Sequence, residues 1–418
     1  MPAKKVSIRR SCIPVLLLSG LPALPANAGP HGFDLHNTLM PASGGMAGTS
    51  LATPLDVPSA LYGNPATLSQ FRGTQAAFGA TLYKPRVEIN HDGSVTGAAF
   101  DAESNTQAFP VPNIAITQDL RGGGIPGTLG IGFSAISGIG AEFKNEPKSL
   151  GAGAEFTVFG VNAGGGFELA DGLSLGGALT VSFAQLDAGL ASSGAEVHDL
   201  GYRGSLGLTY DLPAHTTTAL YYQTELSHTF KNAFQTDSTS GGFPSYSSQT
   251  VEQPANLGFG LSNRSLLDGR LLLALDVIHK SWEQSKFWGD VYNDQTVGSL
   301  GAQLSSGDWR FRLGYGYAED PNKDSPESLG GLDQVQAGVG GKVIPLSTPV
   351  IQYLQATQTV VIYEHRATVG LGYKDLVMEG LDGDIHFGWQ FENDRDFGGH
   401  TKARVSSWQL GFGLTWRM

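Results

Sequence analysis

The chain has 418 residues, a formal net charge of −12, 58 glycines, one cysteine and an aromatic content of 10%. The acidic balance argues against nucleic-acid binding, because phosphate neutralisation needs clustered Lys and Arg. Glycine is about twice as frequent as usual, but it follows no collagen period and aromatic residues are common, so we expect a folded chain.

The N-terminus has the organisation of an export signal. Its first ten residues are basic, residues 13–24 are apolar, and Ala26-Asn27-Ala28 forms a small-x-small cleavage site. We therefore predict a signal peptide over residues 1–28 that is removed on export. The apolar run is shorter than the roughly 20 residues that a membrane-spanning helix needs, and no later stretch qualifies. A retained helical anchor is the alternative for this segment.

The only cysteine, Cys12, lies within the predicted signal peptide. An exported mature chain would then have no disulfide, no thiol chemistry and no thiolate metal site. No pair of histidines has the spacing of metal ligands. We expect no cofactor and no metal.

Residues 29–72 show no regular alternation and are rich in Gly, Ala, Ser and Pro. Asp56 is placed to cap a short helical turn, and Asn64-Pro65 is placed to end one. We predict a compact hatch over residues 29–72, followed by a single barrel domain over residues 73–418.

The C-terminal segment alternates strictly between two kinds of residue. Trp408, Leu410, Phe412, Leu414, Trp416 and Met418 alternate with Gln409, Gly411, Gly413, Thr415 and Arg417. A period of two indicates a β-strand, and the division into bulky apolar and small or polar faces suits a wall between lipid and a polar lumen. The sequence therefore predicts an all-β fold, a transmembrane antiparallel β-barrel.

The same alternation and the turn signals predict about 14 strands, an even number as bacterial barrels have. Short connections alternate with longer, more polar ones, which fits periplasmic turns and outer loops. A secreted β-sandwich or β-propeller is the soluble alternative. The predicted strands are 73–84, 107–118, 128–137, 154–168, 173–186, 201–211, 216–230, 250–262, 270–284, 296–305, 308–318, 361–374, 382–392 and 405–418.

Several stretches resemble one known family, in order along the chain. They are Gly32-Phe33, the small-residue stretch 42–50, Asn64-Pro65-Ala66, residues 201–230, Trp282 with Trp288 and Asp290, and residues 309–317 and 365–373. In these the chain is similar to the FadL/TodX family of outer-membrane transporters for long-chain fatty acids and hydrophobic compounds. The resemblance implies a barrel of about 14 strands that is closed by an N-terminal hatch. It also implies an apolar groove at the outer loops, an inner pocket and lateral release at a kinked third strand.

Candidate substrate-binding residues follow from this resemblance and from their place in the chain. Phe33 matches the hatch residue that reaches the inner pocket, and Asn64, Pro65 and Ala66 are expected to hold the hatch fold. Gly138 and Gly140 are candidates for the lateral gap, because glycine weakens a strand. Residues of the third and fourth long loops are candidates for the groove, with packing between loops as the alternative: Leu186, Leu190, Phe234, Phe243 and Tyr246.

The sixth long loop, about 319–360, is unusually apolar. So apolar a segment is not expected to lie in water. It either lines the path or caps the barrel mouth, and the sequence favours neither.

Arginines on the inward face offer a site for a carboxylate. Arg203, Arg310 and Arg312 are inward by parity and could bind an acidic ligand. The alternative is pairing with neighbouring acids such as Asp276 or Glu392, which we favour.

The functional expectation is uptake of hydrophobic small molecules by passive diffusion, with outer-membrane lipids and the barrel insertion machinery as partners and a monomeric state. A general porin and a barrel enzyme such as a lipid hydrolase are the alternatives. No nucleophile elbow, zinc-protease or phosphate-binding motif is present, so no enzyme is expected. Outer-membrane barrels usually end in an aromatic residue, a position that Met418 occupies here.

Overall fold

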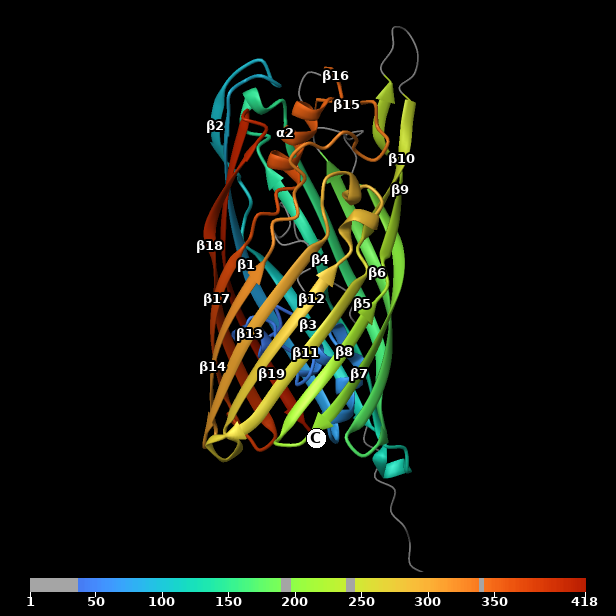
Figure 1. Ribbon diagram of the computed structural model, residues 1–418, viewed down its shortest axis with the longest axis vertical. Helices are drawn as coiled ribbons and strands as arrows, with labels where there is room; N and C mark the ends of the chain where they lie inside the picture. The colour runs from blue at the N-terminus through green and yellow to red at the C-terminus, as the bar shows by residue number, and fades with distance from the viewer. Residues whose placement is uncertain (1–36, 189–196, 238–244, 338–341) are drawn as a thin grey trace, which may run out of the picture.

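Fourteen antiparallel strands form a closed barrel in the computed structural model, which describes residues 37–188, 197–237, 245–337 and 342–418 (Figure 1). The barrel strands are β1 (Thr74–His91), β3 (Phe109–Asp119), β4 (Gly127–Glu142), β5 (Gly153–Ala170), β6 (Leu173–Ala188), β7 (Val197–Leu212), β8 (Thr216–Gln223), β11 (Asn256–Leu266), β12 (Leu271–Lys280), β13 (Gln295–Ser306), β14 (Trp309–Ala318), β17 (His365–Tyr373), β18 (Leu381–Phe397) and β19 (Thr401–Arg417).

Each strand pairs with its neighbours in the chain, and β19 closes against β1 from Gln75↔Arg417 to His91↔Thr401. The predicted fold class is therefore confirmed, and each predicted strand has a counterpart. Several boundaries differ: β1, β4 and β18 extend further than predicted, and the predicted strand 250–262 covers the end of β10 (Ser245–Gln253) and the start of β11. The predicted strand 216–230 covers β8 and the start of β9 (Leu226–Asp237), and the predicted strand 270–284 ends at Lys280, before a 3-10 turn.

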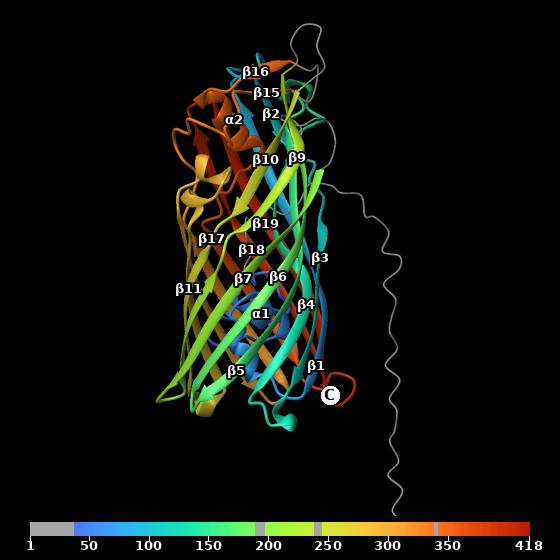
Figure 2. The ribbon, with the colours of Figure 1, turned by 90° about the vertical axis from the view of Figure 1, so that its right-hand side faces the viewer.

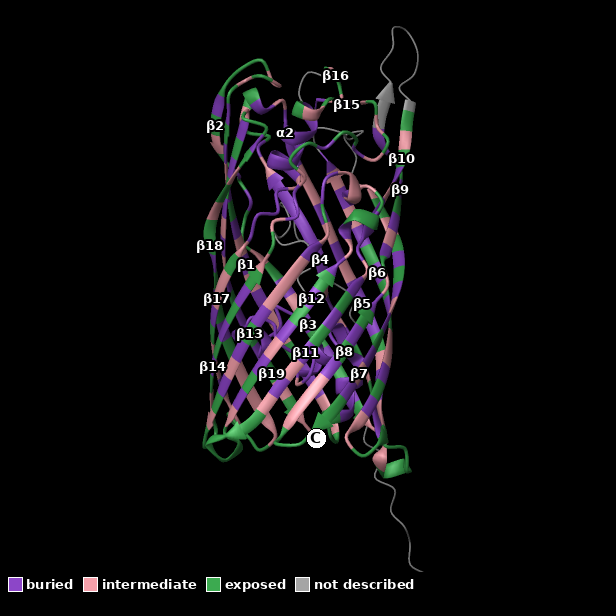
Figure 3. Cartoon of the chain, viewed as in Figure 1, coloured by how far each residue is buried: buried purple, intermediate pink, exposed green. Residues whose placement is uncertain are grey.

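The two faces of the wall differ as the alternation predicts. Phe412 is 59% exposed, whereas Gln409 on the same strand is 2% exposed. Buried and exposed residues alternate along the strands in Figure 3. An apolar exterior and a polar interior are typical of a membrane-embedded barrel.

Connections at the two ends of the barrel differ in size. Short turns join the strands at the lower end in Figure 1, where the C-terminus lies, and long loops crown the upper end. The small upper elements are β2 (Phe100–Glu103), which pairs with β1, the hairpin of β9 and β10 (Ser245–Gln253), the pair β15 (Gln334–Gln336) and β16 (Val343–Pro345), and helix α2 (Thr348–Gln358).

The described part of the hatch, residues 37–72, lies inside the lower half of the barrel (Figure 2). It contains the 3-10 turn η1 (Ser43–Met46), the short helix α1 (Val57–Tyr62) and the 3-10 turn η2 (Pro65–Gln70). The Asp56 side chain caps α1 by accepting a hydrogen bond from Ser59 N at 2.9 Å, as the sequence predicts. Among the described residues, no helix is long and apolar enough to cross a bilayer.

Candidate functional site

Polar side chains on the inner wall hold the backbone of the hatch. The Asp276 carboxylate accepts hydrogen bonds from Ser50 N at 2.7 Å and Leu51 N at 3.0 Å. From the opposite part of the wall, Gln409 Nε2 donates to Thr38 O at 2.7 Å. Buried backbone groups need such partners, so the inward polar residues of the strands fix where the hatch sits.

Asn64, Pro65 and Ala66 pack against the wall where it is made of glycine. Asn64 Nδ2 donates to Leu51 O at 2.8 Å, and Asn64 Oδ1 accepts from Ala66 N at 3.1 Å. A Cβ at Gly176 would fall on backbone atoms of Pro65 and Ala66. None of the three residues lines either of the two cavities described below, and the contacts named here are with the hatch and the wall.

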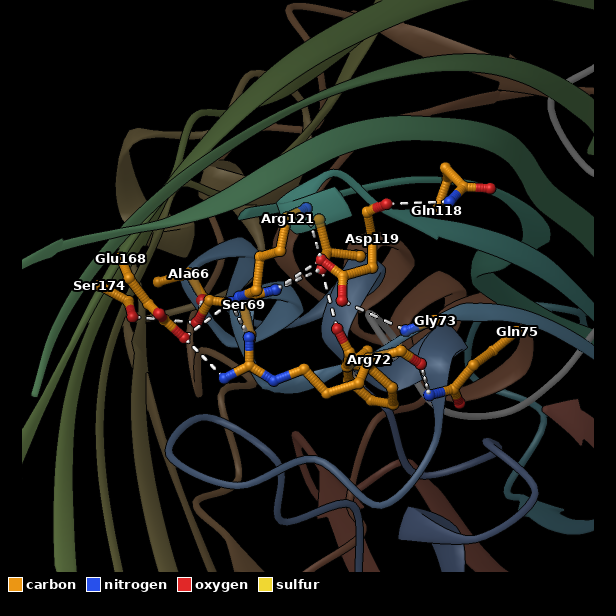
Figure 4. Close-up of polar contacts among 12 residues, drawn as sticks. Ala66, Ser69, Arg72, Gly73, Gln75, Gln118, Asp119, Arg121, Glu168 and Ser174 are labelled. Atoms are coloured by element: carbon orange, nitrogen blue, oxygen red, sulfur yellow. Dashed lines mark hydrogen bonds and ion pairs between the residues drawn. The ribbon is translucent and has the colours of Figure 1, made fainter. Parts of the chain in front are cut away.

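A polar network clamps the end of the hatch at the lower rim (Figure 4). Arg121 donates to Asp119 at 2.8 Å, to Glu168 at 2.7 Å and to the carbonyl of Ser69 at 2.9 Å. Arg72 reaches the same Glu168 oxygen at 3.0 Å. The hatch is therefore tied to the turn after β3 and to the end of β5.

A cavity of about 90 Å³ with a mixed polar and apolar lining lies in the lumen next to the hatch. Thr38, Ala47 and Gly48 of the hatch line it. Inward residues of the strands, together with Val361, Tyr363 and Glu364 before β17, complete the lining. The charged side chains among them are Asp276, Lys280, Glu364 and Arg366. We call this space the lower cavity.

A second cavity, of about 40 Å³, lies beneath the outer loops and is almost entirely apolar. We call it the upper cavity. Strands β4, β5, β6 and β9, the fifth outer loop (281–294) and the sixth outer loop (319–364) contribute its walls. The main lining residues are Ile139, Phe156, Leu186, Phe234, Phe287, Trp288, Val291, Leu329, Ile351 and Leu354.

Aromatic rings build the wall of the upper cavity. Trp288 contacts Phe287 at 4.9 Å, Tyr292 at 5.7 Å and Phe156 at 6.2 Å between ring centroids. Helix α2 forms another wall and is anchored by Tyr353 Oη, which donates to Ser149 O at 2.8 Å. The sixth loop therefore lines an internal space, one of the two possibilities that the sequence left open.

The hydrogen-bond ladder between β3 and β4 stops short of the upper rim. The ladder runs from Asp119↔Thr128 to Asn113↔Ser134 and is not resumed in residues 109–112 and 135–141. A bulge at Ile136 interrupts the pairing of β4 with β5 at the same height. Above it, Asn105 N donates to Glu142 O at 3.0 Å. We call this interruption the β3–β4 window, and side chains fill it here.

Prolines explain why the ladder stops. Pro110 and Pro112 lie on β3 within the window and have no N–H to donate to a neighbouring strand. The predicted gap residues Gly138 and Gly140 lie opposite, on the stretch of β4 that pairs only with β5. The interruption of the ladder thus comes from proline on β3 and a bulge on β4. The two glycines alone did not indicate either feature.

The predicted groove residues separate into three groups. Leu186 and Phe234 are buried and line the upper cavity. Tyr246 is 40% exposed on β10 and does not line it. Leu190 and Phe243 lie outside the described residues, as does Phe33, the predicted hatch residue of the inner pocket.

The three inward arginines have different surroundings. Arg312 pairs with Asp384 at 2.5 Å and donates to Gln303 at 2.7 Å. Arg310 lies at the β13–β14 turn and donates to the carbonyls of Gly307 and Trp309, each at 2.9 Å. Arg203 is 4% exposed, and its Nε and Nη1 atoms have no hydrogen-bond partner among the described residues.

The prediction that Asp276 or Glu392 pairs with these arginines was wrong. Asp276 holds the hatch backbone instead. Glu392 faces outward and lies 3.4 Å from Arg404, because a bulge between Gln390 and Asn393 changes the parity of β18.

The aromatic fifth loop was not predicted as part of the site. Trp282, Phe287, Trp288 and Tyr292 lie close together in the sequence between two strands. Such a density of large rings in a loop is unusual for solvent-exposed chain. This density of rings was the signal that could have identified the fifth loop as a wall of the upper cavity.

No protein-family model and no curated protein matches the sequence, but solved structures of similar fold do. The toluene transporter TodX of P. putida is 17% identical, with a TM-score of 0.63 over 92% of this chain and 99% of that one. A FadL homologue of Pseudomonas aeruginosa is 14% identical, with a TM-score of 0.67 over 92% and 99%. The toluene transporter TbuX of Ralstonia pickettii is 17% identical, with a TM-score of 0.61 over 92% and 99%. The chain therefore has the fold of FadL- and TodX-type barrels, as its sequence indicates.

Proposed function

We propose that this protein carries hydrophobic small molecules, either long-chain fatty acids or aromatic and aliphatic hydrocarbons, across the bacterial outer membrane. The observation that carries the proposal is an apolar, aromatic-walled cavity beneath the outer loops of a barrel whose lumen holds a hatch. The similar fold of the toluene transporters TodX and TbuX supports the same class of cargo.

Physical chemistry explains why such a cavity suits this cargo. A hydrophobic molecule gains roughly 25 cal/mol for each Å² of apolar surface that leaves water. Rings and aliphatic side chains such as Trp288, Phe156 and Leu354 offer it a dry surface. Transport needs no energy input on this proposal, because the compound moves down its own gradient.

The test is uptake of labelled toluene, hexadecane and oleate by cells with and without the protein. Expression should raise uptake of at least one of them above that of cells lacking the protein. A large, steady ion current in a planar bilayer would favour a general porin instead. Release of labelled acyl chains from phospholipid by the purified protein would favour a hydrolase.

We further propose that cargo leaves sideways through the β3–β4 window. Ile136, Ile139 and Ala141 at the window are buried and apolar, so an apolar molecule would move along matching surface. Ile139 also lines the upper cavity, which places one end of the window beside the proposed binding site.

Deleting Ile136 tests the lateral exit. This residue is the extra one in the bulge, so its deletion restores the alternation of β4, with Ser134 and Ser137 inward on either side of Ala135. We expect the deletion variant to form a folded barrel and to bind ligand, but to take up the cargo much more slowly. Ile136→Val keeps the bulge and is the matched control. Equal uptake by the deletion and the control would exclude this exit.

Arg203 is the inward arginine best placed to receive an acidic head group. Its Nε and Nη1 atoms lack a hydrogen-bond partner among the described residues, and a buried guanidinium favours an anion strongly. We propose that Arg203 binds the carboxylate when the cargo is a fatty acid, whereas Arg312 already has Asp384.

A further inference from the structure

A short segment of the sixth outer loop separates the two cavities. Residues 359–364, which we call the strap, lie between α2 and β17. Thr359 lines the upper cavity, whereas Val361, Tyr363 and Glu364 line the lower one. A molecule moving from one cavity to the other along this side of the lumen must pass the strap.

Side chains from three different segments hold the backbone of the strap. Asn322 Nδ2 donates to Val361 O at 2.6 Å, and Asn393 Nδ2 donates to Ile362 O at 3.0 Å. The Tyr292 hydroxyl donates to the carbonyl of Thr359. Burial raises the pKa of Tyr292 well above its usual range, so this hydroxyl keeps its proton.

The latch formed by Asn322 is itself fixed by an ion-pair cluster. Arg395 on β18 pairs with Asp320 and with Asp324 on either side of Asn322. Its Nη2 atom also donates to the Asn322 carbonyl at 2.9 Å. The sixth loop is thus fastened to the barrel wall beside the strap.

Side-chain hydrogen bonds and packing hold the strap, whose residues Val360 to Tyr363 are buried. Its six residues belong to no helix or strand. The carbonyls of Thr359, Val361 and Ile362 accept from side chains. A backbone bond to the wall is found at Glu364 O, which accepts from Ala318 N at 2.9 Å. Side-chain contacts of this kind can break without disrupting a ladder.

Cavity size supplies the reason for movement. An apolar cavity of about 150 Å³ is known to hold benzene, and the upper and lower cavities have about 40 and 90 Å³. Neither cavity reaches that size while the strap lies between them. Displacing the strap would join the two spaces.

We infer that the strap is an internal gate whose opening connects the upper and lower cavities. The inference rests on the proposed transport function and adds the step that limits passage. It assigns the latch to Asn322 and Asn393, which touch the strap backbone and do not line either cavity.

A reversible tether tests the gate directly. Ile362→Cys with Asn393→Cys puts one thiol on each of the two residues that the latch bond joins. The natural chain has no cysteine besides Cys12 in the predicted signal peptide. Oxidation should lower uptake of labelled hydrocarbon at least tenfold, and a reductant should restore it. Each single-cysteine variant is a control. Equal uptake by oxidised and reduced protein would overturn the inference.

A second variant decides the question even if the disulfide does not form. Asn322→Ala with Asn393→Ala removes both latch bonds, and losing one ordinary hydrogen bond changes an equilibrium by about five-fold. We expect uptake at least about five-fold faster. Asn263→Ala removes amide hydrogen bonds at the lower rim instead, among them the bonds from Asn263 Nδ2 to Ala214 O at 3.0 Å and to Thr216 Oγ1 at 2.8 Å, and should leave uptake unchanged. Unchanged or slower uptake by a folded double variant would contradict the gate.

The two proposals fail in different ways. If the wild-type protein raises uptake of no labelled compound, the transport function is refuted and the gate falls with it. If the wild type transports but both variants behave like it, only the gate is refuted. Heat modifiability on gels confirms in each case that the barrel has folded.

Discussion

Gly176→Ala should unseat the hatch while leaving the barrel closed. A methyl group at Gly176 would meet the backbone of Pro65 and Ala66, which no side-chain rotation can move away. Overpacking of this kind costs typically 1–3 kcal/mol. At about 2 kcal/mol, the unseated fraction of the hatch would rise roughly 30-fold.

Planar-bilayer conductance measures that fraction, because an unseated hatch leaves a water-filled lumen. We expect more frequent and longer openings for Gly176→Ala than for the wild type. Cells carrying the variant should also become more sensitive to bulky antibiotics.

The neighbouring glycine provides the control. Gly177 lies on the same strand, and a Cβ there would meet Leu206 at an ordinary 3.7 Å. Both substitutions change strand propensity equally, so only the hatch contact differs. Equal conductance for Gly176→Ala and Gly177→Ala would refute the role of the glycine wall.

Four further predictions concern the cavities, the wall and the chain end. Trp288→Ala removes an aromatic wall of the upper cavity, and fluorescence titration should show about tenfold weaker hydrocarbon binding, roughly 1.4 kcal/mol; unchanged binding would place the site elsewhere. Arg312→Ala leaves Asp384 without its buried partner, at a cost of about 3–5 kcal/mol. The melting temperature measured by gel shift should therefore fall, and adding Asp384→Ala should recover part of the lost stability. Arg203→Gln should slow uptake of oleate but not of hexadecane, whereas equal slowing would exclude a carboxylate role. Met418→Phe should leave assembly unchanged or improved, measured as the folded fraction in outer-membrane extracts; a clear loss would mean that the terminal residue acts otherwise.

The strands were predictable because each faces two different solvents. On β19, lipid outside and a polar lumen inside impose a period of two on residues 408–418. Among secondary structures, only a β-strand gives that pattern. The hatch was predicted from the opposite observation, because residues 29–72 lack this period of two.

Loop contacts could not be predicted in the same way. The upper cavity is built from Phe156, Trp288 and Leu354, which belong to a strand, the fifth loop and the sixth loop. No local pattern relates residues so far apart in sequence. The partner of Arg312 was missed for a similar reason, because register across β14, β17 and β18 brings Asp384 beside it.

The lateral window shows the limit of a residue-type argument. Glycine is common in these strands, so Gly138 and Gly140 carried little information. The missing N–H groups of Pro110 and Pro112 were visible in the sequence. Their meaning depends on β3 being an interior strand of a sheet, where such groups are needed.

The bond between Thr38 and Gln409 also constrains the order of assembly. The two residues are 371 positions apart, and Gln409 belongs to the last strand. Contacts of such separation form late, because the long intervening chain must first be ordered. Docking of the hatch on this side therefore cannot be completed until β19 has been delivered, so a chain truncated before β19 should lose the seating of its first segment along with its final seam.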